Sequence, residues 1–245
     1  GGASGAQVKL RGEIRSMFVT FKGYEDFSFR AGSIRTGLQG TFTGMGDVGY
    51  YEEYDGDGGG GPSQKAKPSL KTISLNLDRT GNGSARWEDL PKLETPSTLH
   101  AELEYLDGNG QAQTSGATIP LYPASLAVGI KPSSWAISKK DLSYQVVVLD
   151  LKGRPVKNAR VSVDLFQEIT HTHRARLVGG FYSYQNTTEI RKVGRHFTGT
   201  TDSHGLVTAS GPSPVSGSIT LHAEVADPSG NIATSNASVW VAGSD

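Results

Sequence analysis

Hydrophobic and polar residues alternate with a period of two in several short segments of this chain. The segment ARVSVDLF at 159–166 is apolar at every second position, and KTISLNLD, TLHAELEY and SITLHAEVA repeat this pattern at 71–78, 98–105 and 218–226. Such alternation is typical of a strand with one wet and one dry face. The segment YQVVVLD at 144–150 is apolar on both faces, as in a central strand. No segment sustains a period of 3.6 residues, so the pattern predicts an all-β, antiparallel fold.

Short turn motifs separate the predicted strands. The pattern Asp-x-x-Gly begins at Asp78, Asp107, Asp150, Asp202 and Asp227. Aspartate can accept hydrogen bonds within its own turn, and glycine adopts the positive φ that the last position needs. We therefore interpret these aspartates as hairpin corners and not as catalytic acids.

The motif LHAE occurs twice, at Leu99–Glu102 and at Leu221–Glu224. The Asp-x-x-Gly turns before and after it recur at nearly the same spacing, which indicates an internal repeat. We predict two tandem antiparallel β-sandwich domains, 1–122 and 123–245, each with about seven strands in two sheets. The join is expected near PLYPASLAVGIKP, where prolines end one sheet.

Residues 44–69 form a glycine-rich and acidic segment with no apolar face. We predict a disordered insertion in the first domain. Within it, DGDGGGG at 55–61 resembles a calcium loop but lacks the distal glutamate of an EF-hand. Its glycines do not lie between a strand and a helix, so a phosphate-binding loop is not indicated either.

Composition and charge exclude several classes of function. The chain has 245 residues, 24 basic and 24 acidic side chains and no cysteine. Balanced charge argues against binding to nucleic acid or to a membrane surface, and no apolar run is long enough to span a bilayer. The start, GGASGA, shows no signal-peptide pattern. Without cysteine there are no disulfides, no thiolate catalysis and no cysteine zinc site.

Candidate catalytic and metal-binding patterns are weak. His171 and His173 would share one face of a strand, but no acidic partners stand at matching spacing. No nucleophile elbow is present, and the carboxylates Glu52, Glu53 and Asp55 lie in the glycine-rich segment, where a site is poorly preorganised. We therefore expect no enzyme activity, no metal and no cofactor.

The second half of the chain resembles a known family in the order of its segments. YQVVVLDLKGRPVKNARVSVDLFQ is similar to the opening of a macroglobulin-like domain. RARLVGGFYSYQ, GTTDSHGLVTA, SGSITLHAEVADPSGN and ASVWVAGSD follow in the order typical of the bacterial α2-macroglobulin family. In the first half, LRGEIRSMFVTFKGYEDFSF and LPKLETPSTLHAELEYLDGNGQAQT resemble the preceding domain of the same proteins.

This resemblance implies a function and a location. Members of the family are large periplasmic proteins, often lipid-anchored, in which a protease cuts an exposed bait segment and the molecule rearranges around it. Many then bond the protease through a thioester that requires cysteine, which this chain lacks. We therefore expect a monomeric internal fragment whose partners are proteases and other domains of the same parent chain.

One departure from the family pattern is specific. Relatives often carry a cysteine pair at the positions that here hold Phe197 and Ala209. Both cysteines are missing together, as expected for a bond lost as a unit. The resemblance therefore implies that this domain relies on core packing alone.

The segment RARLVGGFYSYQ, at Arg174–Gln185, supports two interpretations. In the structural one it is a strand pair with Gly179-Gly180 at a bulge or corner. In the functional one, 167–194 is a bait-type segment that proteases of different specificity could cut after leaving its sheet. The candidate protease-accessible residues combine basic and aromatic or aliphatic side chains: Arg174, Arg176, Leu177, Phe181, Tyr182, Tyr184, Arg191 and Lys192.

Two other functions fit the same sandwich pattern. Tandem sandwiches also serve as spacers or adhesin domains on cell surfaces. An accessory domain of a polysaccharide enzyme would use exposed aromatics such as Tyr50, Tyr51 and Tyr54.

Overall fold

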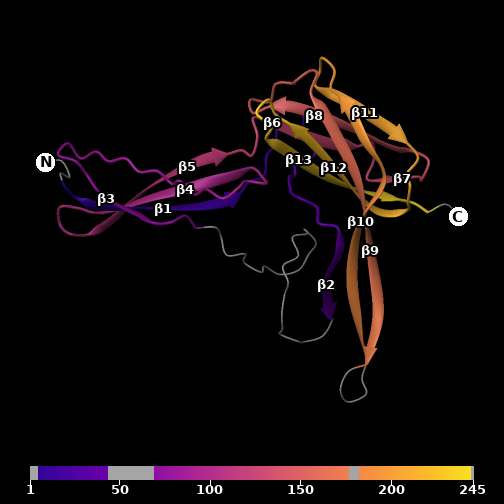
Figure 1. Ribbon diagram of the computed structural model, residues 1–245, viewed down its shortest axis with the longest axis horizontal. Helices are drawn as coiled ribbons and strands as arrows, with labels where there is room; N and C mark the ends of the chain where they lie inside the picture. Colours follow the sequence, from indigo (N-terminus) through magenta and orange to yellow (C-terminus); the bar gives the residue numbers. More distant parts are fainter. Residues whose placement is uncertain (1–4, 44–68, 177–181, 244–245) are drawn as a thin grey trace. The chain divides into compact units, whose positions relative to one another are not determined.

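The computed structural model describes residues 5–43, 69–176 and 182–243, and within them it contains β-strands and no helix (Figure 1). The all-β prediction is confirmed. The strands are β1 (Gln7–Ser16), β2 (Gly37–Thr43), β3 (Ile73–Asn76), β4 (Ser97–Leu106), β5 (Ala112–Leu121), β6 (Leu126–Pro132), β7 (Ala136–Ile137), β8 (Leu142–Asp150), β9 (Arg160–Arg176), β10 (Tyr182–Thr200), β11 (Leu206–Gly211), β12 (Gly217–Ala226) and β13 (Ile232–Val241).

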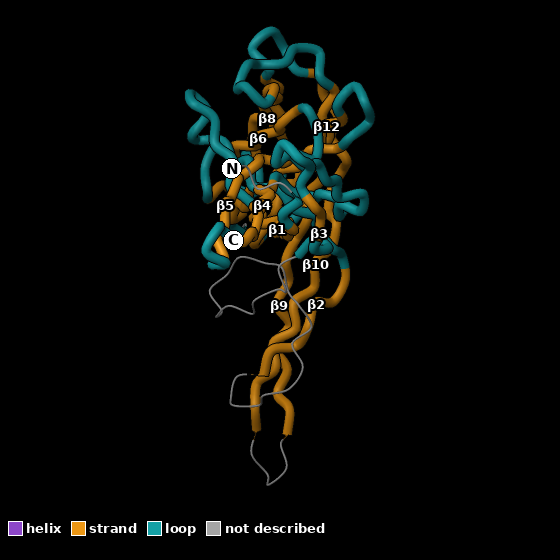
Figure 2. The backbone as a smooth tube through the Cα atoms, turned by 90° about the vertical axis from the view of Figure 1, so that its left-hand side faces the viewer, coloured by secondary structure: helices purple, strands orange, loops and turns teal. Residues whose placement is uncertain are grey.

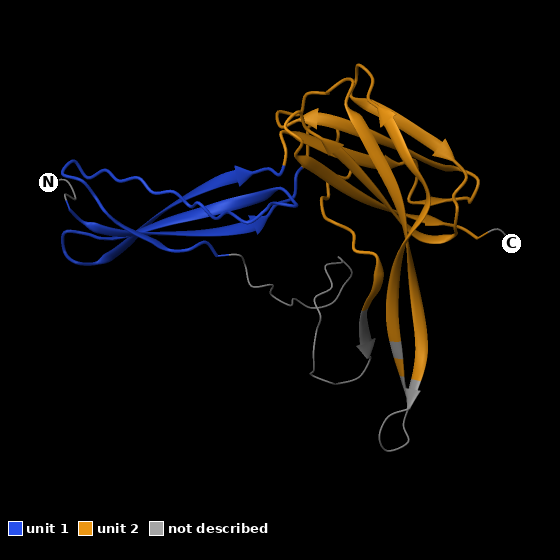
Figure 3. Cartoon of the chain, in the orientation of Figure 1, with its two compact units in different colours: residues 1–19, 64–123 blue, residues 20–63, 124–245 orange. Residues whose placement is uncertain are grey.

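The chain divides into two compact units (Figure 3). Unit 1 comprises Gly1–Val19 and Gln64–Pro123, and unit 2 comprises Thr20–Ser63 and Ala124–Asp245. Unit 2 thus includes Thr20–Ser63, a segment that the predicted tandem arrangement assigns to the first domain. The chain passes from one unit to the other three times, and not once.

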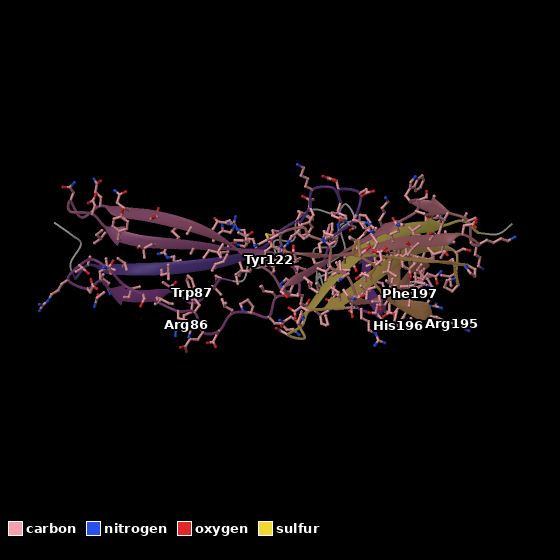
Figure 4. All side chains as sticks on the ribbon, turned by 90° about the horizontal axis from the view of Figure 1, so that it is seen from above. Arg86, Trp87, Tyr122, Arg195, His196 and Phe197 are labelled. Carbon is pink, nitrogen blue, oxygen red and sulfur yellow. The ribbon has the colours of Figure 1, made fainter. Side chains whose placement is uncertain are left out.

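Unit 1 contains one four-stranded antiparallel sheet in the order β3-β1-β4-β5. Its apolar face includes the buried side chains of Val8, Ile14 and Leu99. Trp87 packs on this face, and its indole Nε1 donates a hydrogen bond to the Lys71 carbonyl at 2.8 Å (Figure 4). A Cβ on Gly12 would lie 3.0 Å from the Trp87 ring, so this close approach requires glycine.

Unit 2 is a sandwich of two sheets. One has the order β2-β10-β9-β12-β13-β7 and the other β11-β8-β6. Their facing sides form one core, because the apolar residues alternate along β9 and β12 as predicted. Val161, Val163, Ile219 and Leu221 are at most 1 % exposed. In β8, Val146, Val147, Val148 and Leu149 are all fully buried, as expected for the strand that is apolar on both faces.

All five Asp-x-x-Gly motifs are turns, as predicted. In each, the glycine amide donates to the carbonyl of the aspartate, at 2.9 to 3.1 Å, and the glycine has a positive φ. Each aspartate also accepts hydrogen bonds from backbone amides of its own turn. These lower the pKa in four of the five motifs, and at Asp227 the amide of Ser125 is the first cause of the lowered pKa.

The two LHAE motifs occupy equivalent places. Leu99–Glu102 lies in β4 and Leu221–Glu224 in β12, and each strand continues through an Asp-x-x-Gly turn into its antiparallel neighbour. The order β3-β1-β4-β5 in unit 1 matches β10-β9-β12-β13 in unit 2. In the described part of unit 1, no second sheet corresponds to β11-β8-β6. The turn at Asp78 follows β3 as the turn at Asp202 follows β10. The repeat therefore covers the four-stranded sheet of unit 1 and the sheet of unit 2 that contains β9 and β10.

Residues 20–36, which we call the strap, form backbone hydrogen bonds with β6 and β13 of unit 2. Ser28 and Ile130 exchange backbone hydrogen bonds at 2.8 and 2.9 Å, and the Asn236 amide donates to the Arg30 carbonyl at 2.8 Å. The buried rings of Phe21 and Phe29 meet edge to face, with centroids 4.9 Å apart. The strap then leads into β2, which pairs with β10.

Phe197 and Ala209 both pack against the core of unit 2. The Phe197 ring lies edge to face on buried Tyr144, with centroids 6.2 Å apart, and Ala209 pairs with Tyr144 across β8 and β11. Aromatic packing therefore occupies the place that the family resemblance assigns to a cysteine pair. Burial also raises the pKa of the Tyr144 hydroxyl to about 12.

The predicted disordered insertion at 44–69 lies outside the described residues except for Ser69, which forms a bridge with Glu13. The calcium-like loop and the aromatics Tyr50, Tyr51 and Tyr54 lie there too.

Candidate functional site

The strands β9 and β10 are much longer than the sandwich that they belong to. They have 17 and 19 residues, whereas β12 pairs with β9 only from Val161 to Gln167. Beyond this point the two strands continue as a projecting hairpin with β2 beside it (Figure 2). We call the part formed by 168–176 and 182–191 the ribbon.

The sequence of the ribbon explains its regular pairing. Threonine and isoleucine recur along both strands, and β-branched residues favour a pleated strand. Cross-strand hydrogen bonds join Thr172 Oγ1 to Asn186 Oδ1 at 2.8 Å and His173 Nε2 to Thr187 Oγ1 at 3.3 Å. The structural interpretation of RARLVGGFYSYQ as part of a strand pair is therefore confirmed for the described residues.

The structure separates the predicted site residues into two groups. Arg174 and Tyr184 pair with each other near the tip, as do Arg176 and Tyr182 in the backbone register. Arg191 and Lys192 lie at the base, about 25 Å away along the strand. Leu177 and Phe181 lie outside the described residues. Among the tip residues, the Tyr184 side chain is 63 % exposed, which shows that it does not pack on the sheet.

Near the base, a bulge interrupts the pairing of β9 with β10. Gly194, Arg195 and His196 stand opposite Asp164 alone, between the pairs Val193–Leu165 and Phe197–Val163. Gly194 has a φ of 68°, which favours glycine. The bulge redirects the chain where the ribbon leaves the sandwich.

Asp164 links the two sides of the bulge. Its carboxylate accepts from Lys192 Nζ at 2.8 Å and contacts His196 Nδ1 at 2.7 Å; Figure 4 labels His196. Burial opposes ionisation, but these two partners outweigh it and hold the pKa of Asp164 below its usual value. Lys192 therefore has a structural contact as well as being a candidate cleavage position.

A second ion-pair cluster lies in the ribbon. His171 Nε2 lies 2.9 Å from Glu189 Oε2, and Arg191 Nη2 lies 3.3 Å from the same oxygen. The hydrogen bond with His171, followed by that with Arg191, lowers the pKa of Glu189. The predicted shared face of His171 and His173 is thus occupied by polar cross-strand partners.

The described residues contain no group of three or more His, Cys, Asp or Glu side chains that could hold a metal ion. They also contain no helix that is long and apolar enough to cross a membrane.

Sequence patterns missed two features of this site. In the sequence, Asp164 occupies a solvent-facing position of an alternating strand. Its partners, Lys192 and His196, lie far along the chain. The strand β2 has the sequence GLQGTFT, in which two glycines mask any alternation. Its pairing with β10 depends on a contact between segments more than 140 positions apart, which no local pattern encodes.

Known proteins with a similar sequence or fold are alpha-2-macroglobulins. No family model matches the chain. A curated protein, the alpha-2-macroglobulin homolog of Nostoc sp. (strain PCC 7120 / SAG 25.82 / UTEX 2576), is 22 % identical over 184 residues, which cover 74 % of this chain and 10 % of that protein. The native E. coli alpha-2-macroglobulin structure covers 100 % of this chain with a TM-score of 0.55 at 15 % identity.

The chain is similar in sequence and in fold to bacterial α2-macroglobulins. Salmonella alpha-2-macroglobulin reacted with methylamine gives the same TM-score, 0.55, at 15 % identity and covers 98 % of the chain. Each of these two solved chains is matched over only 14 % of its length. The chain therefore spans only a small part of the length of the relatives it is similar to.

Proposed function

We propose that this chain forms structural domains of a periplasmic protease-trapping inhibitor of the α2-macroglobulin type, and that the ribbon of unit 2 is its protease-accessible segment. The main support is the fold likeness over the whole chain to bacterial α2-macroglobulins. Two of the similar structures, both from E. coli, are described as activated by porcine elastase and by trypsin. In this role the chain binds proteases as targets and catalyses nothing itself.

The composition and position of the ribbon support the finer part of the proposal. The ribbon projects beyond the paired part of β12, so its strands have fewer neighbours to hold them. Arg174 and Arg176 suit trypsin-like proteases, and Tyr182 and Tyr184 suit chymotrypsin-like ones. A protease binds its substrate as an extended strand, so one strand of the ribbon must first separate from its partner.

Limited proteolysis tests this proposal. The complete chain is treated briefly with low trypsin or chymotrypsin, and the first cuts are mapped by mass spectrometry. We expect trypsin to cut first after Arg174 or Arg176, and chymotrypsin after residues between Leu177 and Tyr184. The double variant Arg174→Gln/Arg176→Gln should delay the trypsin cut and leave the chymotrypsin pattern unchanged.

Lys9→Gln on β1 is the matched control and should not change the pattern, since Lys9 lies in unit 1. First cuts confined to 44–69, with 167–194 intact, would contradict the assignment of the ribbon.

A further inference from the structure

The chain contains two Asn-Gly pairs, and both lie at turns of unit 1. Asn82-Gly83 ends the turn that begins at Asp78, and Asn109-Gly110 lies within the turn that begins at Asp107. Both asparagines are exposed. The side chain of an asparagine before glycine can react with the next backbone nitrogen, because no Cβ hinders their approach. The sequence alone makes the two pairs equivalent.

The backbone amide of the glycine distinguishes the two pairs. The Gly110 N–H donates to the Asp107 carbonyl at 2.9 Å. The Gly83 N–H, by contrast, donates no hydrogen bond among the residues that the structure describes. An amide nitrogen attacks a carbonyl carbon only after it gives up its proton, and a hydrogen bond that holds this proton opposes the attack. The turn therefore protects Asn109 and leaves Asn82 open to reaction.

The side chain of Asn82 is only lightly held. Its Nδ2 donates to Thr80 Oγ1 at 2.8 Å, in an exposed hydrogen bond. Such a bond contributes little against water, so the side chain loses little when it turns toward the Gly83 nitrogen. The atom in this bond is also the one that leaves the residue as ammonia. The described contacts of Asn82 therefore allow the reaction.

We propose that Asn82 is a modification site, at which the folded chain deamidates spontaneously and forms isoaspartate. The Gly83 nitrogen bonds to Asn82 Cγ, the Cγ–Nδ2 bond breaks, and the proton of the attacking nitrogen leaves with Nδ2 as ammonia. Water then opens the resulting cyclic imide. Opening at Cγ gives aspartate, and opening at the backbone carbonyl carbon gives isoaspartate. Water is the only co-reactant, and the inference is independent of protease trapping.

Isoaspartate at this position loosens the end of β3. The Asn82 N–H donates to Asp78 Oδ1 at 2.9 Å, and the Asn82 carbonyl accepts from the Asp78 N–H at 2.8 Å. A Cβ on Gly83 would lie 2.5 Å from Leu75 Cδ1, so this glycine packs directly on β3. Isoaspartate adds one methylene to the main chain between these two contacts and places a second carboxylate beside Asp78. Like charges repel, so both changes weaken the turn that follows this four-residue edge strand.

Peptide mapping by mass spectrometry tests the proposal, with Asn109 as the internal control. The complete chain is incubated at mildly alkaline pH, either folded or in concentrated urea. In the folded chain, Asn82 should deamidate about fivefold faster than Asn109, because one hydrogen bond protects the Gly110 nitrogen. In urea, which removes both turns, the two rates should become similar. A folded chain in which Asn109 reacts as fast as Asn82, or in which Asn82 stays intact while the unfolded chain reacts, would overturn the proposal.

Two variants test the effect on β3 separately. Asn82→Gln keeps an amide but cannot form the same ring, and Asn82→Asp supplies the charge without the extra methylene. Amide hydrogen exchange over Ile73–Asn76 should be several-fold faster in the isoaspartate fraction of the incubated chain than in Asn82→Asp. Incubated Asn82→Gln should exchange at its starting rate. Equal exchange in the isoaspartate fraction and in Asn82→Asp would show that the longer main chain does not loosen β3 and would overturn this part of the inference.

Discussion

The side chain of one turn aspartate, Asp227, also forms a tertiary contact. Asp227 begins a turn like the other four aspartates, but its carboxylate also accepts from the backbone N and Oγ of Ser125, at 2.9 and 3.0 Å. These contacts join the β12–β13 turn to the beginning of β6. The pattern Asp-x-x-Gly predicted the turn, and it could not reveal Ser125, because that contact joins residues 102 positions apart.

The carboxylate of Asp227 should make the stability of unit 2 depend on pH. Its hydrogen bonds, first that from the Ser125 amide, lower its folded-state pKa below the value of about 3.9 expected in the unfolded chain. The stabilisation is therefore present above about pH 4 and is lost as the pH falls toward the folded-state pKa. Asp227→Asn should lower the Tm at pH 7 by several degrees, and the difference should shrink at pH 3.

Thermal unfolding followed by circular dichroism measures this effect. Asp202→Asn is the control, because the described contacts of the Asp202 carboxylate are hydrogen bonds from the amides of His204 and Leu206 in its own turn. An equal loss of Tm in both variants at pH 7 would show that the contact with Ser125 contributes nothing.

Gly129 provides a second prediction at the scale of single residues. A Cβ here would lie 2.7 Å from the Phe29 ring and 3.0 Å from Val147. Gly129→Ala should therefore destabilise unit 2 by about 1–3 kcal/mol through overpacking. Urea unfolding measures the change, and Phe29→Leu in the same chain should recover part of it.

Gly211→Ala is the matched control, because nothing lies within 4 Å of a Cβ at that glycine. If Gly129→Ala were as mild as Gly211→Ala, Phe29 would not pack on β6 as the structure shows.

At the scale of secondary-structure elements, strands with a local pattern were predicted and those without one were not. The alternation in 159–166 predicted which face of β9 is buried, and the core positions of Val161, Val163 and Leu165 confirm it. For the continuation of β9 as a ribbon, the sequence is compatible with both a strand and a bait segment. A hairpin outside a core has no dry face, so periodicity alone cannot separate these two states.

The bulge that ends the ribbon should depend on Asp164. In Asp164→Ala, Lys192 and His196 lose their shared partner, and the strand between them is held less firmly. Amide hydrogen exchange over 190–197 should become roughly tenfold faster, while exchange in β12 and β13 stays unchanged. Glu189→Ala is the comparison, since it removes an ion pair within the ribbon and spares the bulge. Uniform acceleration in both variants would argue against a specific role for Asp164.

At the scale of the whole molecule, the internal repeat was visible in the sequence, but the course of the chain was not. LHAE and its framing turns mark equivalent sheets in the two units. The strap, however, belongs to unit 2 although in the sequence it comes between β1 and β3, which are strands of unit 1. Its contacts with Ile130 and Asn236 are formed largely by backbone groups, which leave no mark on sequence patterns.

The strap predicts that unit 2 is incomplete when produced from residue 124 onward. The fragment 124–245 lacks Phe21, Phe29 and β2, so its Tm should lie at least about 5 °C below that of unit 2 in the complete chain. A peptide of residues 20–43, added in excess, should raise the Tm of the fragment, because it binds only the folded state. Equal melting temperatures for fragment and chain would favour the simple tandem division at 122/123.

The interleaved course of the chain has a consequence for biosynthesis. The strap is translated before its partners, because Ser28 Oγ donates to the carbonyl of Asn236, which is made 208 residues later. Unit 1 can close once β5 has emerged, while residues 20–43 meet their partners only after β6, β10 and β13 have been made. Contacts so distant in sequence slow folding. The strand β2 therefore stays unpaired in the nascent chain until β10 has been synthesised.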